Sequence, residues 1–267
     1  ELYMRTDNTS DLQSLMTVYD GLLPESARRY AIHAELLIKR SEYDAACARL
    51  KEACRIDPRT GYLYRYADLL LNLERDDEAA TVLRRYRDQV SSSAPLLIVE
   101  AHVNARLGNS EGVVRATAAA CRVYDEQAAL NYPSVWEHLR AAVYPDHVSG
   151  VVKQLVTDKV DIRRQRMFLQ AIFQRVPSSD ALRESLRELR ALTGGTPTEP
   201  IVMMILADAC RASGHADEAE TLYRDAVEMR PKDPLLLNAL ADFLLVDKDQ
   251  PLEARKLARD AVRLAAK

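Results

Sequence analysis

Apolar and small residues recur along most of the chain at the spacing of one helix face, and the pattern is clearest from Pro200 to Pro231. Met203, Leu206 and Cys210 follow the i, i+3, i+7 spacing of a first helix. Gly214 interrupts this pattern, and a second helix follows it. The proline at the end of the stretch stops that helix, because proline has no amide hydrogen for the helical ladder. The stretch therefore predicts two helices joined by a short turn.

Small residues mark the contact between these two helices. Ala207, Ala219 and Ala226 allow a close approach of the two backbones, and Tyr223 fills the space beside them. This order of landmarks resembles the tetratricopeptide repeat, which has a period of about 34 residues. The resemblance implies an all-α fold, a right-handed α-solenoid in which antiparallel helix hairpins stack into a superhelix.

The same landmarks divide the rest of the chain. We expect a partial repeat helix, three repeats, two degenerate hairpins and two further repeats, which lie at residues 1–26, 27–127, 128–199 and 200–267 in that order. In the degenerate part, Ser178 or Ser179 should cap a helix that Gly194 and Gly195 end, and residues 196–200 read as an extended linker. A break into two sub-arrays around residues 194–200 is the alternative.

Two local features refine this division. Residues 10–13, Ser-Asp-Leu-Gln, match a capping box and predict the start of the first helix. Tyr86 stands where the repeat usually has a small residue, so the packing of that second helix should be looser or shifted.

Composition and charge narrow the classes of partner. The 37 basic and 40 acidic residues give a net charge of −3 and a pI near 6.0, which argues against general attraction to nucleic acid or anionic membrane. No apolar run approaches the roughly 18–20 residues that a spanning helix needs. The chain opens on Glu1 and ends without a polar capping helix, so we expect a piece of a longer array, open to self-association through its ends. A cytoplasmic location is favoured and a periplasmic one stays open.

The sequence offers little chemistry for catalysis. The five histidines show no metal-ligand spacing, and no glycine-rich loop could cradle a phosphate. The four cysteines read as small buried residues of a reducing compartment. We therefore expect no enzyme activity, no catalytic residue, no metal and no cofactor in this chain.

The resemblance implies that the first helix of each repeat lines a concave groove. The positions that would face a partner there are Glu35, Tyr64, Arg65, Asp68, Ile98, His102, Arg106, Met204, Asp208, Arg211, Asn238 and Asp242. Four of them repeat an acid at the ninth place of a repeat, which predicts an acidic ridge that selects a basic segment. The alternative is that these acids balance the nearby arginines. Tyr64 is expected to be the main apolar anchor, flanked by Asp68 and His102.

Three functions are consistent with this pattern. The first is a non-catalytic scaffold that holds a protein or peptide segment in the groove. The second is a scaffold region of a larger enzyme or of an envelope or polysaccharide-export assembly, with catalysis elsewhere. The third is a structural role in which arrays stack end to end. Repeats that read RNA are normally basic, so this acidic groove argues against nucleic acid.

Overall fold

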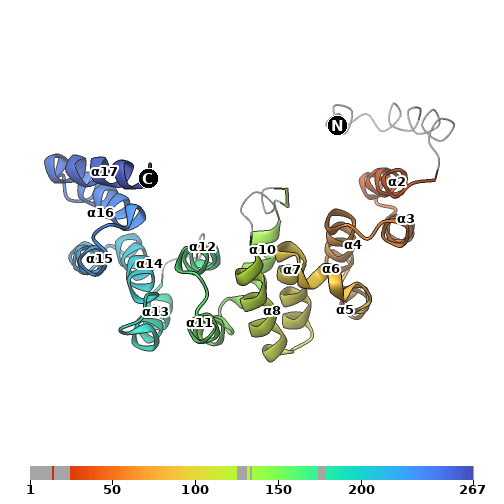
Figure 1. Ribbon diagram of the computed structural model, residues 1–267, viewed down its shortest axis with the longest axis horizontal. Coiled ribbons are helices and arrows are strands. Elements are labelled where there is room, and N and C mark those ends of the chain that lie inside the picture. The colour runs from red at the N-terminus through yellow and green to blue at the C-terminus, as the bar shows by residue number, and fades with distance from the viewer. Residues whose placement is uncertain (1–13, 15–24, 125–130, 133, 174–178, 267) are drawn as a thin grey trace. The chain divides into compact units, whose positions relative to one another are not determined.

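The computed structural model describes residues 14, 25–124, 131–132, 134–173 and 179–266, which form helices joined by turns with no strand among them (Figure 1). The chain divides into two compact units, residues 1–142 and 143–267. The expected all-helical fold of hairpins is confirmed. The capping box at residues 10–13 and most of the helix expected after it lie outside the described residues. None of the described helices combines the length and apolarity needed to cross a bilayer.

The first unit holds the helices on the N-terminal side of the division. In chain order they are α2 (Ala27–Lys39), α3 (Tyr43–Ile56), α4 (Thr60–Asn72), α5 (Asp76–Arg85), α6 (Arg87–Ser91), α7 (Ala94–Arg106), α8 (Ser110–Val123) and α10 (Val135–Val143), whose last residue already belongs to the second unit.

The second unit contains the remaining helices. They are α11 (Val148–Thr157), α12 (Ile162–Phe173), α13 (Asp180–Thr193), α14 (Glu199–Ala212), α15 (Ala216–Met229), α16 (Pro234–Val246) and α17 (Pro251–Ala265). The side chain of Ser179 caps α13 by accepting a hydrogen bond of 3.2 Å from the Leu182 amide, so the cap expected at this place is confirmed.

Neighbouring helices pack as hairpins within each unit. In unit one α2 packs on α3, α4 on α5 and α7 on α8, and in unit two α14 packs on α15 and α16 on α17. We call the two members of such a pair its first and second helix. Alanines of the second helices are almost fully buried in these contacts, namely Ala46, Ala53, Ala79, Ala120, Ala219, Ala226, Ala254 and Ala261. A methyl side chain lets two helices approach closely, which explains why alanine recurs there.

The turns inside the hairpins share one backbone conformation. A left-handed residue ends the first helix in five of them, at Ser41, Glu74, Gly108, Gly214 and Asp249. In four of these turns the next amide donates back across the helix end, for example from Glu42 to the Leu37 carbonyl at 2.8 Å and from His215 to the Cys210 carbonyl at 2.9 Å. These bonds satisfy carbonyls that the helix leaves open. Gly108 and Gly214 adopt the conformation without a steric cost.

Residues 194–200 differ from the sequence prediction. They form a tight turn in which the Thr196 amide donates to the Thr193 carbonyl at 2.9 Å and the Gly195 amide donates to the Glu199 carboxylate at 2.8 Å. The buried Thr198 hydroxyl donates to Gln165, and α13 packs on α14. The prediction of an extended linker was therefore wrong, because short polar side chains close the turn instead. The two sides of this turn pack together, so the alternative break is absent here.

Tyr86 interrupts the second helix that contains it. The other second helices run for 14 or 15 residues, whereas α5 ends after ten residues at Arg85 and the short α6 begins at Arg87. At the equivalent place α3, α8 and α15 carry buried alanines. A tyrosine ring does not fit the space that a methyl group fills, so the helix breaks and the ring turns aside. This agrees with the expected shift in packing.

Candidate functional site

Side chains from α4, α7, α10 and the segment just before α10 meet in a cluster of aromatic and polar groups in unit one. The Tyr64 hydroxyl on α4 shares a hydrogen bond of 2.8 Å with the Ser134 hydroxyl, which lies just before α10. The Tyr132 ring packs on the Tyr64 ring with centroids 4.6 Å apart. Tyr64 is only 4% exposed as a result. Residues some 70 positions further along the chain therefore cover the face where Tyr64 was expected to meet a partner.

A hydrogen-bonded chain links three helices beside this tyrosine. His138 Nε2 on α10 lies 2.9 Å from the Asp68 carboxylate on α4, and His138 Nδ1 lies 2.8 Å from His102 Nδ1 on α7. A carboxylate only accepts, so His138 donates from Nε2. One of the two facing Nδ1 atoms donates to the other, so the proton positions of His102 and His138 are linked.

Burial sets the protonation of this cluster. Desolvation, followed by the nearby His138 and Arg106, lowers the pKa of His102 to about 4, so this imidazole is neutral at pH 7. Desolvation also raises the pKa of Tyr64, although its hydrogen bond with Ser134 opposes that rise. The cluster therefore holds a neutral His102 and a neutral Tyr64 near the carboxylate of Asp68. Its hydrogen-bonding groups are largely used internally.

Several residues predicted to face a partner lie in the interior. Besides Tyr64, Ile98 on α7 is 1% exposed and Met204 on α14 is 2% exposed. The prediction that these three side chains are free at the surface is wrong, because each packs against neighbouring helices of its own unit. Tyr132, Ser134 and His138 were not predicted at all. A partial signal for the histidine existed, because Asp68, His102 and His138 lie 34 and 36 residues apart, close to the period of the repeat.

The repeated acids have partners within the chain. Glu35 pairs with Arg65 across α2 and α4, and Asp208 accepts a hydrogen bond from the Tyr223 hydroxyl. Asp208 is exposed, yet the surrounding protein partly desolvates its carboxylate and thereby raises its pKa. Because these two acids and Asp68 have partners within the chain, they argue against the predicted ridge of unpaired acidic side chains.

The arginines among the predicted residues also bridge neighbouring elements. Arg106 donates from Nε to the Asp76 carboxylate and from Nη1 to the Leu71 carbonyl, both at 3.0 Å. Arg211 lies 2.7 Å from both the Asp242 and the Asp247 carboxylates. The bridge from Arg211 leaves one positive charge between two negative ones.

The first helix α16 presents a different surface. Asn238, Asp242 and Leu245 follow the i, i+4, i+7 spacing and are all exposed, with Val246 beside them. Leu245 is 53% and Val246 65% exposed. Asn238 and Asp242 were predicted to face a partner, and the two apolar residues were not. We call these four residues the α16 stripe.

No centre for metal or thiol chemistry emerges. Within the described ranges, no three histidine, cysteine or acidic side chains come together in a way that would hold a metal ion. Cys47, Cys54, Cys121 and Cys210 are all buried and form no disulfide, so the expectation of buried cysteines is confirmed. Burial raises the pKa of Cys54 to about 12, which keeps it a thiol at neutral pH.

Comparison with known proteins identifies the repeat. Residues 33–94 and 200–243 match family models of the tetratricopeptide repeat. These two stretches are therefore tetratricopeptide repeats, a type of repeat whose general role is protein binding. The resemblance inferred from the landmarks of residues 200–231 is confirmed.

Other comparisons are less informative. Comparison with curated proteins gave no match. Among solved structures, a chain from the "Structure of Naa15/Naa10 bound to HypK-THB" aligns with 97% of this chain at 18% identity and a TM-score of 0.48. The alignment covers 41% of that chain, so the present chain spans about two-fifths of its length.

Proposed function

We propose that this chain is a non-catalytic scaffold that binds a segment of a partner protein along its first helices, with the α16 stripe as the principal contact. The observation that carries the proposal is the exposure of Leu245 and Val246 beside Asn238 and Asp242 on one helix face. Large apolar side chains grouped at the surface of a helix mark interaction sites more often than isolated ones do.

The chemistry of the stripe favours a particular kind of segment. Leu245 and Val246 suit one or two apolar side chains of the partner. Asp242 and Asp247 share the single charge of Arg211, so a surplus negative charge lies next to the apolar residues. A segment with apolar and basic side chains complements this surface, and its charge would raise the rate of association more than the affinity.

The stripe lies on a rigid support. Leu237, Leu240 and Leu244 are buried on the opposite side of α16, and the ring of Phe243 packs 5.2 Å from that of Tyr223 on α15. A surface held in this way loses little conformational entropy on binding.

The proposal can be tested by selection from a library of random short peptides on the immobilised chain. We expect enriched peptides to combine apolar with lysine or arginine residues. Amide chemical-shift mapping of one synthetic enriched peptide should place it at residues 238–246. Peptides without basic residues, or shifts that leave α16 unaffected, would contradict the proposal.

A further inference from the structure

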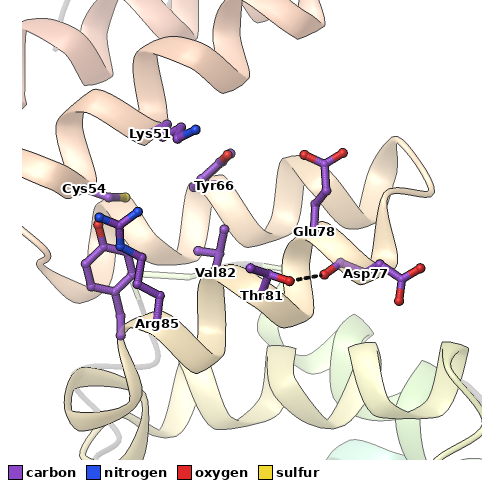
Figure 2. A pocket seen from close by; sticks show the side chains of 9 residues that line it. Lys51, Cys54, Tyr66, Asp77, Glu78, Thr81, Val82 and Arg85 are labelled. Carbon is purple, nitrogen blue, oxygen red and sulfur yellow. Dashed lines mark hydrogen bonds between the residues drawn. The ribbon is translucent and has the colours of Figure 1, made fainter.

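The interruption of the second helix at Tyr86 coincides with a pocket on α3, α4 and α5. The pocket has a volume of about 300 Å³ (Figure 2). Its buried wall is formed by Tyr66 of α4 and Cys54 of α3, and Thr81 and Val82 of α5 line another side. Tyr86, the residue that breaks the helix, completes the lining. The pocket thus lies where this hairpin departs from the other four.

The pocket lining carries two basic and two acidic side chains, and these differ in how far they are paired. Lys51 and Arg85 both line it, and within the described part of the chain neither forms an ion pair. The Arg85 guanidinium lies 5.7 Å from the centre of the Tyr86 ring, a contact that uses the face of the ring and leaves its N–H donors available.

The two acids of the lining offset these cations only in part. The Glu78 carboxylate accepts hydrogen bonds of 2.6 and 2.8 Å from Arg75, which also pairs with Asp44; the bonds from Arg75 and, to a lesser extent, the charge of Lys51 lower the pKa of Glu78. The Asp77 side chain points away from the other labelled side chains in Figure 2, and only its backbone carbonyl contacts Thr81. Among the described residues, two cations without an ion pair, Lys51 and Arg85, thus line the pocket against one such carboxylate, Asp77, which points away.

The chemistry of the wall limits what the pocket could do. Burial raises the pKa of Tyr66 to about 12 and that of Cys54 to about 12, so both side chains are neutral. A neutral, buried thiol is a poor nucleophile, which argues against covalent chemistry. A cavity of this size is at the small end of ligand sites and suits one large side chain better than a whole cofactor.

We propose that this pocket binds an acidic peptide segment, which inserts one aromatic side chain against Tyr66 and Val82 and places its carboxylates on Lys51 and Arg85. Arginine binds carboxylates through parallel N–H donors, so Arg85 sets the position of the acidic residue. An aromatic side chain in a small pocket is the usual energetic centre of a protein interface. This site is independent of the α16 stripe, because it lies in the other unit and takes the opposite charge.

The test uses three synthetic peptides that differ only in charge, acetyl-Gly-Asp-Phe-Asp-Gly-amide and its counterparts with asparagine or lysine in place of both aspartates. Binding to the full chain is measured by amide chemical shifts and by calorimetry. We expect the acidic peptide to bind, with shifts at residues 51–54 and 77–86, and the neutral peptide to bind at least about tenfold more weakly. No binding of the acidic peptide, or equal binding of all three, would overturn the proposal.

Variants then assign the contacts. Arg85→Glu and Lys51→Glu should each weaken the acidic peptide by about tenfold or more, and Thr81→Trp should abolish binding by filling the pocket. Arg84→Glu is the matched control, because this exposed arginine is adjacent in sequence but does not line the pocket. It should change affinity by less than about threefold. Equal losses in Arg84→Glu and Arg85→Glu would reject the site. Circular dichroism verifies that each variant is folded. Lys51→Glu on α3 and Arg85→Glu on α5 should weaken the same peptide, so each provides an independent test of the site.

Discussion

His102 and His138 face each other through their Nδ1 atoms at 2.8 Å, and the second of them also bonds Asp68. This contact joins α7 and α10, and through Asp68 it reaches α4. The three helices are thus connected by a chain of hydrogen bonds in which one histidine Nδ1 donates to the other. A second proton on this pair would place two N–H groups against each other.

Stability should depend on pH through His102. Its pKa is about 4 in the folded chain and about 6.5 in an unfolded one, so the unfolded chain binds more protons between these values. The contribution of the neutral imidazole is complete above about pH 6.5 and is lost as the pH falls towards 4, to an extent of roughly 2–3 kcal/mol. Urea unfolding of wild type and His102→Gln at several pH values measures this contribution to the free energy of unfolding.

The comparison needs a control histidine. His215 is exposed, and His215→Gln should leave the pH dependence of the free energy of unfolding as in wild type. His102→Gln should flatten the pH dependence of the free energy of unfolding between about pH 4 and 6.5. If both variants follow the wild-type profile, His102 is not the titrating group and the hydrogen-bonded arrangement described above is incorrect.

Two adjacent glycines provide a backbone test. Gly195 has a φ of +70° and Gly194 does not have a positive φ, and a Cβ at Gly195 would meet no atom within 4 Å. Gly195→Ala should therefore cost about 1–2 kcal/mol through backbone strain alone. Gly194→Ala should cost less than about 0.5 kcal/mol, since its Cβ would make only ordinary contacts. Equal midpoints of denaturation would mean that the turn has another conformation.

Replacement of Tyr86 by alanine should join α5 and α6 into one helix. Alanine fits the contact that Ala53 and Ala226 make in other hairpins, and it favours helix. Hydrogen exchange of amides 86–88 should slow by about tenfold or more. Tyr43→Ala, at an exposed tyrosine of α3, should leave these rates unchanged. Unchanged rates in Tyr86→Ala would show that the ring is not the cause of the break.

Overpacking tests the contact within a hairpin. Ala219 is fully buried between α14 and α15, so Ala219→Leu should destabilise the chain by about 1–3 kcal/mol. The exposed Ala212 at the end of α14 is the control, and Ala212→Leu should stay within about 0.5 kcal/mol of wild type. A melting curve of Ala219→Leu that coincides with that of wild type would be inconsistent with this packing.

The sequence predicted local features better than distant ones. The cap at Ser179, the turn at Gly214 and the buried Ala219 and Ala226 each depend on a few neighbouring residues, and all were predicted correctly. The burial of Tyr64 depends on Ser134, which lies 70 residues further along the chain. The periodic pattern of apolar residues in the sequence contains no information about a contact between residues so far apart.

The candidate site was predictable in part for the same reason. Asn238 and Asp242 were found from their places in the repeat, and the structure shows them exposed. Leu245 and Val246 were not predicted, because an apolar residue in a helix is usually expected to be buried. Only the packing of α16 in the structure shows that these two side chains are exposed.

The most direct test of the central claim is the dissociation constant of one selected peptide for three forms of the chain. Leu245→Arg places a charge within the α16 stripe, and Leu252→Arg makes the same change at a leucine of α17 that is 86% exposed. We predict that Leu245→Arg weakens binding by about tenfold or more, whereas Leu252→Arg stays within about twofold of wild type. Equal affinity of all three forms would contradict binding at the first helix α16.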